Sequence, residues 1–290
     1  MPAFDPAAFE VPTTKAGAMS YLLLMVSMGH HHWHRGEVRA DKALGFVGKM
    51  HALYPELLLK ETARMRAKAK KRSNLRLVLF PDLQRPGYIQ WWLLATPGSG
   101  LVYERERMKS VHEHPLLWLD QYQIQRVTSV FKPGKSGAKQ QKQTWSWSLQ
   151  REYRASLRDS VKSYADAEAP DAIRALAGLF KRLRVMPMFA GIRDDIEGLD
   201  RYARESFDKK HRKAGYPGFS EALPYMTRIK VFEGLTLGAL VDAMRKDQEK
   251  ADEVAADLAQ SVLSNNDASS VGPQPLKAVD GVGEEKRERT

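Results

Sequence analysis

Four histidines stand close together in the segment Gly29-His-His-His-Trp-His-Arg-Gly36. Neutral imidazole is the commonest metal ligand in proteins, and alternate residues of a strand point to one side, so His30, His32 and His34 are candidate metal ligands. No carboxylates follow at the spacing of a known metal site. The alternative is that this segment is a polar turn at the end of a strand. We therefore predict no cofactor, and a divalent metal only if the protein cleaves nucleic acid.

A second pair of histidines occurs in His112-Glu113-His114. With a tyrosine on a following helix, this pair resembles the histidine–hydrophobe–histidine strand of rolling-circle replication initiators and relaxases. The resemblance implies a metal-dependent nicking or processing nuclease with His112, His114 and Tyr153 as catalytic candidates. The chain departs from that pattern because Glu113 replaces the hydrophobe and Pro115 follows at once. Tyr153 also fits the apolar stripe of its predicted helix.

Cationic residues gather in two runs that adjoin tryptophan-bearing strands. Residues 60–76 hold eight basic residues and one acid, and residues 132–142 hold four lysines and no acid. Nucleic-acid-binding sheets combine cations for phosphates with flat side chains for stacking. We predict an interface made of Arg64, Arg66, Lys68, Lys70, Lys71, Arg72, Lys132, Lys135, Lys139, Lys142, Trp145 and Trp147. The alternative is that the tryptophans form the core and the cations are merely solvated.

Composition limits the classes of protein that this chain can represent. Its 290 residues are 43% hydrophobic, which is enough to bury a substantial core. A formal net charge of +11 favours a polyanionic partner, and we expect nucleic acid, DNA or RNA, rather than a membrane. The chain has no cysteine, which excludes disulfides, thiolate nucleophiles and cysteine zinc sites. The apolar run 19–28 is too short to cross a bilayer and lacks a basic leader, so we expect a cytoplasmic protein.

The order of apolar runs predicts the elements that position these residues. Residues 75–80 and 88–95 form one predicted hairpin, and residues 118–131 with 144–149 form a second. The adjacent Trp91 and Trp92 must face opposite sides of their sheet. The run 19–28 is predicted as the first buried strand. Asp41 is predicted to cap a helix, and Pro55 to begin another.

Beyond the second hairpin, apolar residues recur at helical spacing. We predict helices from residue 150 to about 164, from 171 to 183 and from 189 to 213, and a final helix capped by Thr236 and reaching about Leu263. The fold class is α+β: an antiparallel sheet with packed helices, a helical C-terminal part and a disordered tail. The predicted organisation is a flexible arm (1–17), a sheet domain (18–149), a helical region (150–264) and the tail (265–290).

Two short segments carry a further resemblance. Residues 88–98 and 223–228 are similar to stretches of uncharacterised proteins of proteobacterial plasmids and integrative conjugative elements. This resemblance implies a mobile genetic element, a setting in which nucleic-acid handling is common, and it transfers no catalytic residue. We therefore expect a nucleic-acid-binding protein, and the sequence leaves open whether it is also an enzyme. The alternatives are the nuclease described above and a structural subunit of a larger complex with protein partners.

Overall fold

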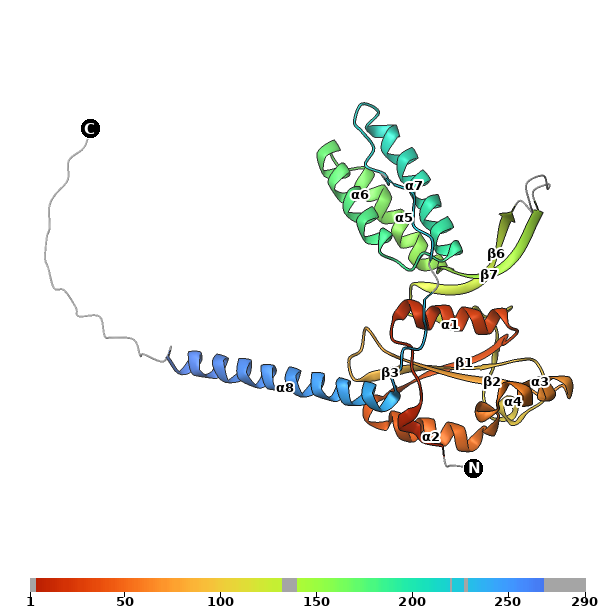
Figure 1. Cartoon of the computed structure of the whole chain (residues 1–290). Coiled ribbons are helices and arrows are strands. Elements are labelled where there is room, and N and C mark those ends of the chain that lie inside the picture. The colour runs from red at the N-terminus through yellow and green to blue at the C-terminus, as the bar shows by residue number, and fades with distance from the viewer. Residues whose placement is uncertain (1–3, 132–139, 220, 227–228, 269–290) are drawn as a thin grey trace, which may run out of the picture. The chain divides into compact units, whose positions relative to one another are not determined.

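The computed structural model describes residues 4–131, 140–219, 221–226 and 229–268 (Figure 1). It is an α+β fold with antiparallel sheets and a helical C-terminal part, which confirms the predicted class. The strands are β1 (His32–Arg39), β2 (Leu75–Pro81), β3 (Tyr88–Ala95), β4 (Lys109–Ser110), β5 (Leu117–Trp118), β6 (Tyr122–Phe131) and β7 (Gln140–Leu149). The α-helices are α1 (Lys15–Ser27), α2 (Ala43–Leu53), α3 (Glu61–Ala69), α4 (Leu101–Arg105), α5 (Arg151–Ala165), α6 (Ala169–Arg184), α7 (Ala190–Lys210) and α8 (Leu237–Ala268).

The larger sheet has the strand order β2-β3-β1-β4, and the predicted first hairpin is its β2–β3 pair. β1 runs antiparallel to β3, from His32 opposite Ala95 to Arg39 opposite Tyr88. Apolar side chains cover both faces of this sheet. Trp92 belongs to the cluster shared with α1, and Trp91 packs against the cluster shared with α2. The prediction that these two tryptophans face opposite sides is confirmed.

Residues 19–28 form most of helix α1, so the predicted first strand is wrong. The helix is buried around most of its circumference, at Met19, Leu22, Met25 and Val26. It lies between the larger sheet and the β6–β7 hairpin (Figure 1), and such a helix is apolar on nearly all sides. A continuous apolar run cannot be distinguished from a buried strand by its periodicity. The missed signal was Thr14, whose hydroxyl caps the helix by accepting the Gly17 N–H at 3.0 Å.

The predicted polar turn after that run is mostly strand β1. Gly29, with φ of 100°, makes the turn, and His32 then begins the strand. Asp41 does not cap α2 as predicted. Its carboxylate accepts two hydrogen bonds from Arg39, while Lys42 occupies the cap position without a capping side-chain bond. The helix predicted at Pro55 is divided into a 3-10 helix (Pro55–Leu58) and α3.

The segment before α1, predicted as an arm, contacts the core in its described part. Residues 6–8 form a 3-10 helix, and Val11 is fully buried in the cluster that contains α2. Phe4 stacks on His51 with ring centroids 3.7 Å apart. The N-terminal segment therefore covers one face of the larger sheet's core.

The second hairpin is the β6–β7 pair of the smaller sheet, whose order is β5-β6-β7. The predicted helices that follow are α5, α6 and α7. One continuous core joins Trp92, Trp118 and Trp147 to Leu157 of α5 and Ile196 of α7. Trp92 stacks on Trp118 with ring centroids 4.6 Å apart and planes inclined by 22°.

Helix α7 is fixed to β7 through its first turns. The Gly191 N–H donates to Ser146 Oγ at 3.0 Å, and the Asp195 carboxylate accepts the Leu149 N–H at 2.9 Å and the Arg154 guanidinium at 2.7 Å. A Cβ on Gly191 would lie 2.6 Å from the Trp147 carbonyl oxygen, so only glycine permits this approach.

Thr236 caps α8 as predicted, accepting the Ala239 N–H at 3.3 Å. Residues 265–268 of the predicted tail belong to α8, and residues 269–290 lie outside the described part of the chain. By its contacts the chain divides into two units, residues 1–245 and 246–290. Within the described ranges, no helix is both long and apolar enough to cross a membrane.

Substituting two glycines should have opposite effects on stability. Gly191→Ala should lower the free energy of unfolding by about 1–3 kcal/mol, because the new Cβ displaces the β7 backbone. Gly178→Ala, in the middle of α6 and with no atom within 4 Å of its Cβ, should raise it by about 0.5–1 kcal/mol. Urea denaturation measures both changes. Equal effects of the two substitutions would show that α7 does not approach β7 as described.

Candidate nucleic-acid interface

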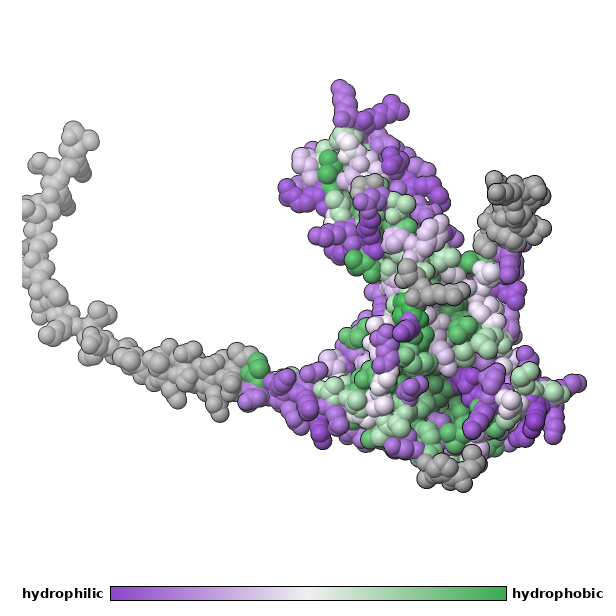
Figure 2. Space-filling model, in the orientation of Figure 1, coloured by the Kyte–Doolittle hydropathy of each residue, from purple (hydrophilic) through white to green (hydrophobic). Residues whose placement is uncertain are grey.

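Helix α3 and the residues just after it carry one buried arginine and a set of exposed cations. Arg66, Lys68, Lys70 and Lys71 are exposed, and no carboxylate of the described residues forms an ion pair with them. Arg72 is also exposed, but its guanidinium lies 3.6 Å from Glu56. Figure 2 shows mostly hydrophilic residues at the α3 end of the molecule. This end therefore presents uncompensated positive charge to solvent.

Arg64 points inward and holds three chain segments together. It is 7% exposed, and its guanidinium donates to the carbonyls of Leu59, Leu75 and Leu57 at 2.5, 3.4 and 3.1 Å. Its donors are therefore engaged inside the protein. Arg64 belongs to the structure of the site and does not present its charge to a phosphate, in contrast to its place in the predicted interface.

Trp145 is the half-buried aromatic residue of the smaller sheet, and it gathers three other side chains. Its ring centroid lies 5.8 Å from that of His31 and 5.3 Å from that of His112, and the Arg126 guanidinium lies 5.1 Å from the ring centre. We call these four residues the Trp145 cluster. Arg126 is directly opposite Trp145 in the β6–β7 register, which explains the cation–π contact.

Strand pairing brings the two predicted histidine groups together in this cluster. β4 pairs with the start of β1, and the Val111 N–H donates to the His31 carbonyl at 2.8 Å. His31 Nδ1 and His112 Nε2 are consequently 3.4 Å apart. Partial burial lowers the pKa of His31, and the neighbouring His112 lowers it further. At neutral pH His31 therefore adds a flat, uncharged ring to the cluster.

The remaining histidines point elsewhere. His32 and His34 lie on the other face of β1, where His32 Nδ1 is 3.1 Å from the Tyr103 hydroxyl and His34 Nε2 is 3.6 Å from Glu106. His114 is exposed, and its carbonyl accepts the Trp33 indole N–H. No group of three or more histidine, aspartate or glutamate side chains is arranged to hold a metal in the part of the chain that the structure describes. The divalent metal of the nuclease alternative stays a prediction.

Other predicted residues have clear places. Trp147 is fully buried, and its indole N–H donates to the Met19 carbonyl at 2.8 Å, so it belongs to the core and not to a stacking surface. Tyr153 is half-buried against the core, and this burial raises the pKa of its hydroxyl. Lys142 is exposed on β7. Lys132, Lys135 and Lys139 lie outside the described residues.

A pocket lies beside the exposed cations of α3. It is lined by Lys68 and Met65 of α3, by Arg76 of β2 and by His30, the residue before His31. We call it the α3 pocket. The sequence analysis treated His30 as a metal candidate and passed over Met65, Asn74 and Arg76. Only the tertiary packing of α1, α3 and β2 shows that they share one concave surface.

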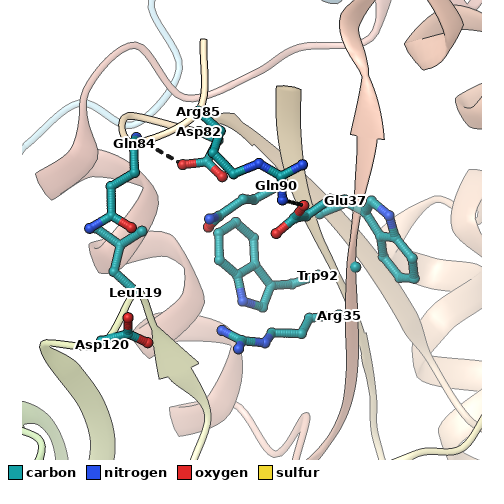
Figure 3. Close-up of a pocket in the computed structure, with 11 residues that line it drawn as sticks. Arg35, Glu37, Asp82, Gln84, Arg85, Gln90, Trp92, Leu119 and Asp120 are labelled. Carbon is teal, nitrogen blue, oxygen red and sulfur yellow. Dashed lines mark hydrogen bonds and ion pairs between the residues drawn. The ribbon is translucent and has the colours of Figure 1, made fainter. Parts of the chain in front are cut away.

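A second pocket lies on the same face of the larger sheet as α1, and Figure 3 shows its residues. Arg85 pairs with Glu37, Asp82 accepts the Gln84 N–H at 2.9 Å, and Arg35 donates to the Leu117 carbonyl at 3.3 Å. Asp120 adds another carboxylate to the lining. Because its cations are balanced by carboxylates, this pocket offers a phosphate less attraction than the α3 end.

Substitutions of Arg64 and of Arg66 should distinguish a buried arginine that stabilises the fold from an exposed arginine that does not. Arg64→Met should lower the free energy of unfolding by about 3 kcal/mol, because three buried carbonyls lose their donor. Arg66 lies on the same helix but is exposed. Arg66→Met should therefore change the free energy of unfolding by less than about 0.5 kcal/mol. Thermal and urea denaturation measure both. Equal stability of the two variants would contradict the inward position of Arg64.

His30 should make stability depend on pH. Burial lowers the pKa of His30 to about 4, and the nearby Arg76, Arg64 and His31 act in the same direction, against the hydrogen bond to Met25. As the pH falls, His30 takes up a proton in the unfolded chain near its ordinary pKa of 6.5, but in the folded protein only near pH 4. The free energy of unfolding therefore decreases progressively between these two pH values. His30 should lower the free energy of unfolding by about 2 kcal/mol as the pH falls from 7 to 5.

The measurement is urea denaturation at both pH values. His30→Gln should lose about 2 kcal/mol less than the wild type over this interval. His114→Gln, at an exposed position whose side chain is remote from His30 in the hydrogen-bond network, serves as the control variant. An unchanged pH dependence in His30→Gln would rule out a neutral, buried His30.

Comparisons of the chain with protein-family models, with curated proteins and with solved structures gave no match.

Proposed function

We propose that this protein binds single-stranded nucleic acid along the surface formed by the Trp145 cluster, the α3 pocket and the exposed cations of α3. The observation that carries the proposal is the position of Trp145. A half-buried indole, flanked by His31 and His112 and covered in part by the Arg126 guanidinium, is a surface on which a base can stack.

The charges support a strand that continues from this cluster towards α3. Arg66, Lys68, Lys70 and Lys71 supply cations without carboxylate partners in the described ranges. Phosphate contacts give affinity and position, whereas stacking requires bases that are not already stacked in a duplex. The combination favours a single strand over a double helix. DNA and RNA both satisfy it.

No observation in the described part of the chain favours the nuclease or the structural-subunit alternative more strongly. The mobile-element setting likewise stays a prediction. The proposed activity is binding without a chemical step.

Two substitutions should reduce binding in different ways. Replacement of Lys68, Lys70 and Lys71 by alanine should weaken binding of a single-stranded oligonucleotide and lower the slope of log K against log salt by about 2, since each phosphate contact contributes about 0.7. Trp145→Ala should weaken binding about tenfold without changing this slope, because it removes stacking and no charge.

Fluorescence anisotropy at several salt concentrations provides both values. A control variant with Lys162, Lys181 and Lys213 replaced by alanine loses the same charge from α5, α6 and the residues after α7, and should change the slope by much less than the α3 variant does. Equal affinities and slopes in wild type, α3 variant and control would remove this surface from the mechanism.

A further inference from the structure

Two imidazoles of the Trp145 cluster face each other at the separation of two ligands on one metal ion. His31 Nδ1 and His112 Nε2 are 3.4 Å apart, and their ring planes are inclined by 83°. A good hydrogen bond from an N–H group spans about 2.7–3.2 Å, so a direct bond between these nitrogens is long. Two nitrogens bound at about 2.0–2.1 Å to a tetrahedral zinc ion are about 3.3–3.4 Å apart. The observed distance therefore fits shared coordination better than a direct hydrogen bond.

Main-chain hydrogen bonds hold the two histidines in place. The Val111 N–H donates to the His31 carbonyl at 2.8 Å, which sets the segment after β4 beside the start of β1. The His112 N–H donates to Ser110 Oγ at 3.3 Å, and the His114 N–H closes the same turn by donating to the Ser110 carbonyl at 2.8 Å. An ion would therefore meet two ligands whose backbones are already positioned, which reduces the ordering cost of binding.

The surroundings of the pair leave room for an ion and its waters. His112 is exposed and His31 is half-buried, so the space between the two nitrogens is open to solvent. The Trp145 ring lies against both imidazoles and gives the site an apolar side. Arg126 has the opposite effect, because its positive charge acts on His31 and repels a cation.

We propose that His31 and His112 together bind one divalent transition-metal ion, and that zinc is the ion their spacing suits. Imidazole is a ligand for zinc, copper and nickel, whereas magnesium and calcium prefer oxygen ligands. Water completes the coordination, and no cleavage step is attached to the ion. The proposal goes beyond the proposed function, because stacking on Trp145 and phosphate contacts to the α3 cations need no metal. It also differs from the sequence prediction, which did not pair His31 with His112.

Calorimetric titration of the full, untagged chain at neutral pH tests the site with zinc chloride, and magnesium chloride is the comparison. One zinc ion should bind each chain, and magnesium should give no saturable binding. Cobalt(II), which substitutes for zinc and absorbs visible light strongly when tetrahedral, should give a band that saturates at one equivalent. Absence of saturable zinc binding would refute the proposal.

Single substitutions then locate the ion. His112→Ala removes an exposed ligand without disturbing the core, and His31→Ala removes the other. Each should weaken zinc binding about tenfold or more, since even loss of an outer-shell partner of a metal ligand costs that much. His114→Ala is the matched control, because it removes an exposed histidine of the same turn, and it should leave zinc binding unchanged. Equal losses in His112→Ala and His114→Ala would contradict the pair.

Arg126→Gln provides a change in the opposite direction. It removes a positive charge that acts on His31, and should tighten zinc binding about threefold. Glutamine keeps a side chain that can bond Gln143, the present partner of Arg126. Zinc binding that is unchanged or weaker in this variant would place the ion away from the Trp145 cluster.

Oligonucleotide binding with and without EDTA separates this proposal from the proposed function. Zinc binding that is lost in His112→Ala, together with no oligonucleotide binding by the wild type, would support the metal site and refute the strand-binding function. Oligonucleotide binding that EDTA does not alter, together with no saturable zinc binding, would refute the metal site and leave the strand-binding function in place.

Discussion

Burial of α1 between two sheets is the interaction on which the rest of this structure depends. The helix contributes Met19, Leu22 and Met25 to a core that includes Trp92 of the larger sheet and Trp147 of the smaller one. The Trp147 indole donates to the Met19 carbonyl and so ties the hairpin to the helix. Because protein interiors are closely packed, the position of α1 determines the spacing of both sheets.

The candidate interface follows from that arrangement. β1 begins just after α1 ends, so His30 and His31 lie beside the last turn of the helix, where the Met25 carbonyl lies 3.2 Å from His30 Nδ1. β4 then places His112 against His31, and the β6–β7 register places Arg126 over Trp145. The stacking surface therefore combines residues positioned by both sheets, and neither sheet forms it alone.

Electrostatics distinguish this surface from the other concave regions. In the pocket of Figure 3, arginines are matched by carboxylates. On α3, the helical period directs Arg64 inward and leaves Arg66 and Lys68 exposed. One basic run therefore supplies both a buried structural arginine and solvent-exposed cations. Exposed cations without partners attract polyanions, whereas the buried arginine contributes only to the fold.

The amino-acid sequence by itself determined the α+β class, both hairpins, the helices after residue 150 and the cap at Thr236. Each of these depends on local signals, such as turn residues, alternation and helical spacing, that survive without tertiary context. The opposite orientation of Trp91 and Trp92 followed from strand geometry alone. The charge runs were also accessible from the sequence.

Tertiary structure alone decided the secondary structure of residues 19–28, since a segment buried on both sides is continuously apolar as either helix or strand. It also decided that Arg64 and Trp147 face inward while Lys68 and Trp145 face outward, because burial depends on which neighbours pack against each residue. The α3 pocket has no sequence signature: His30, Met65, Asn74 and Arg76 come from separate segments, and only the packing of α1, α3 and β2 brings them together.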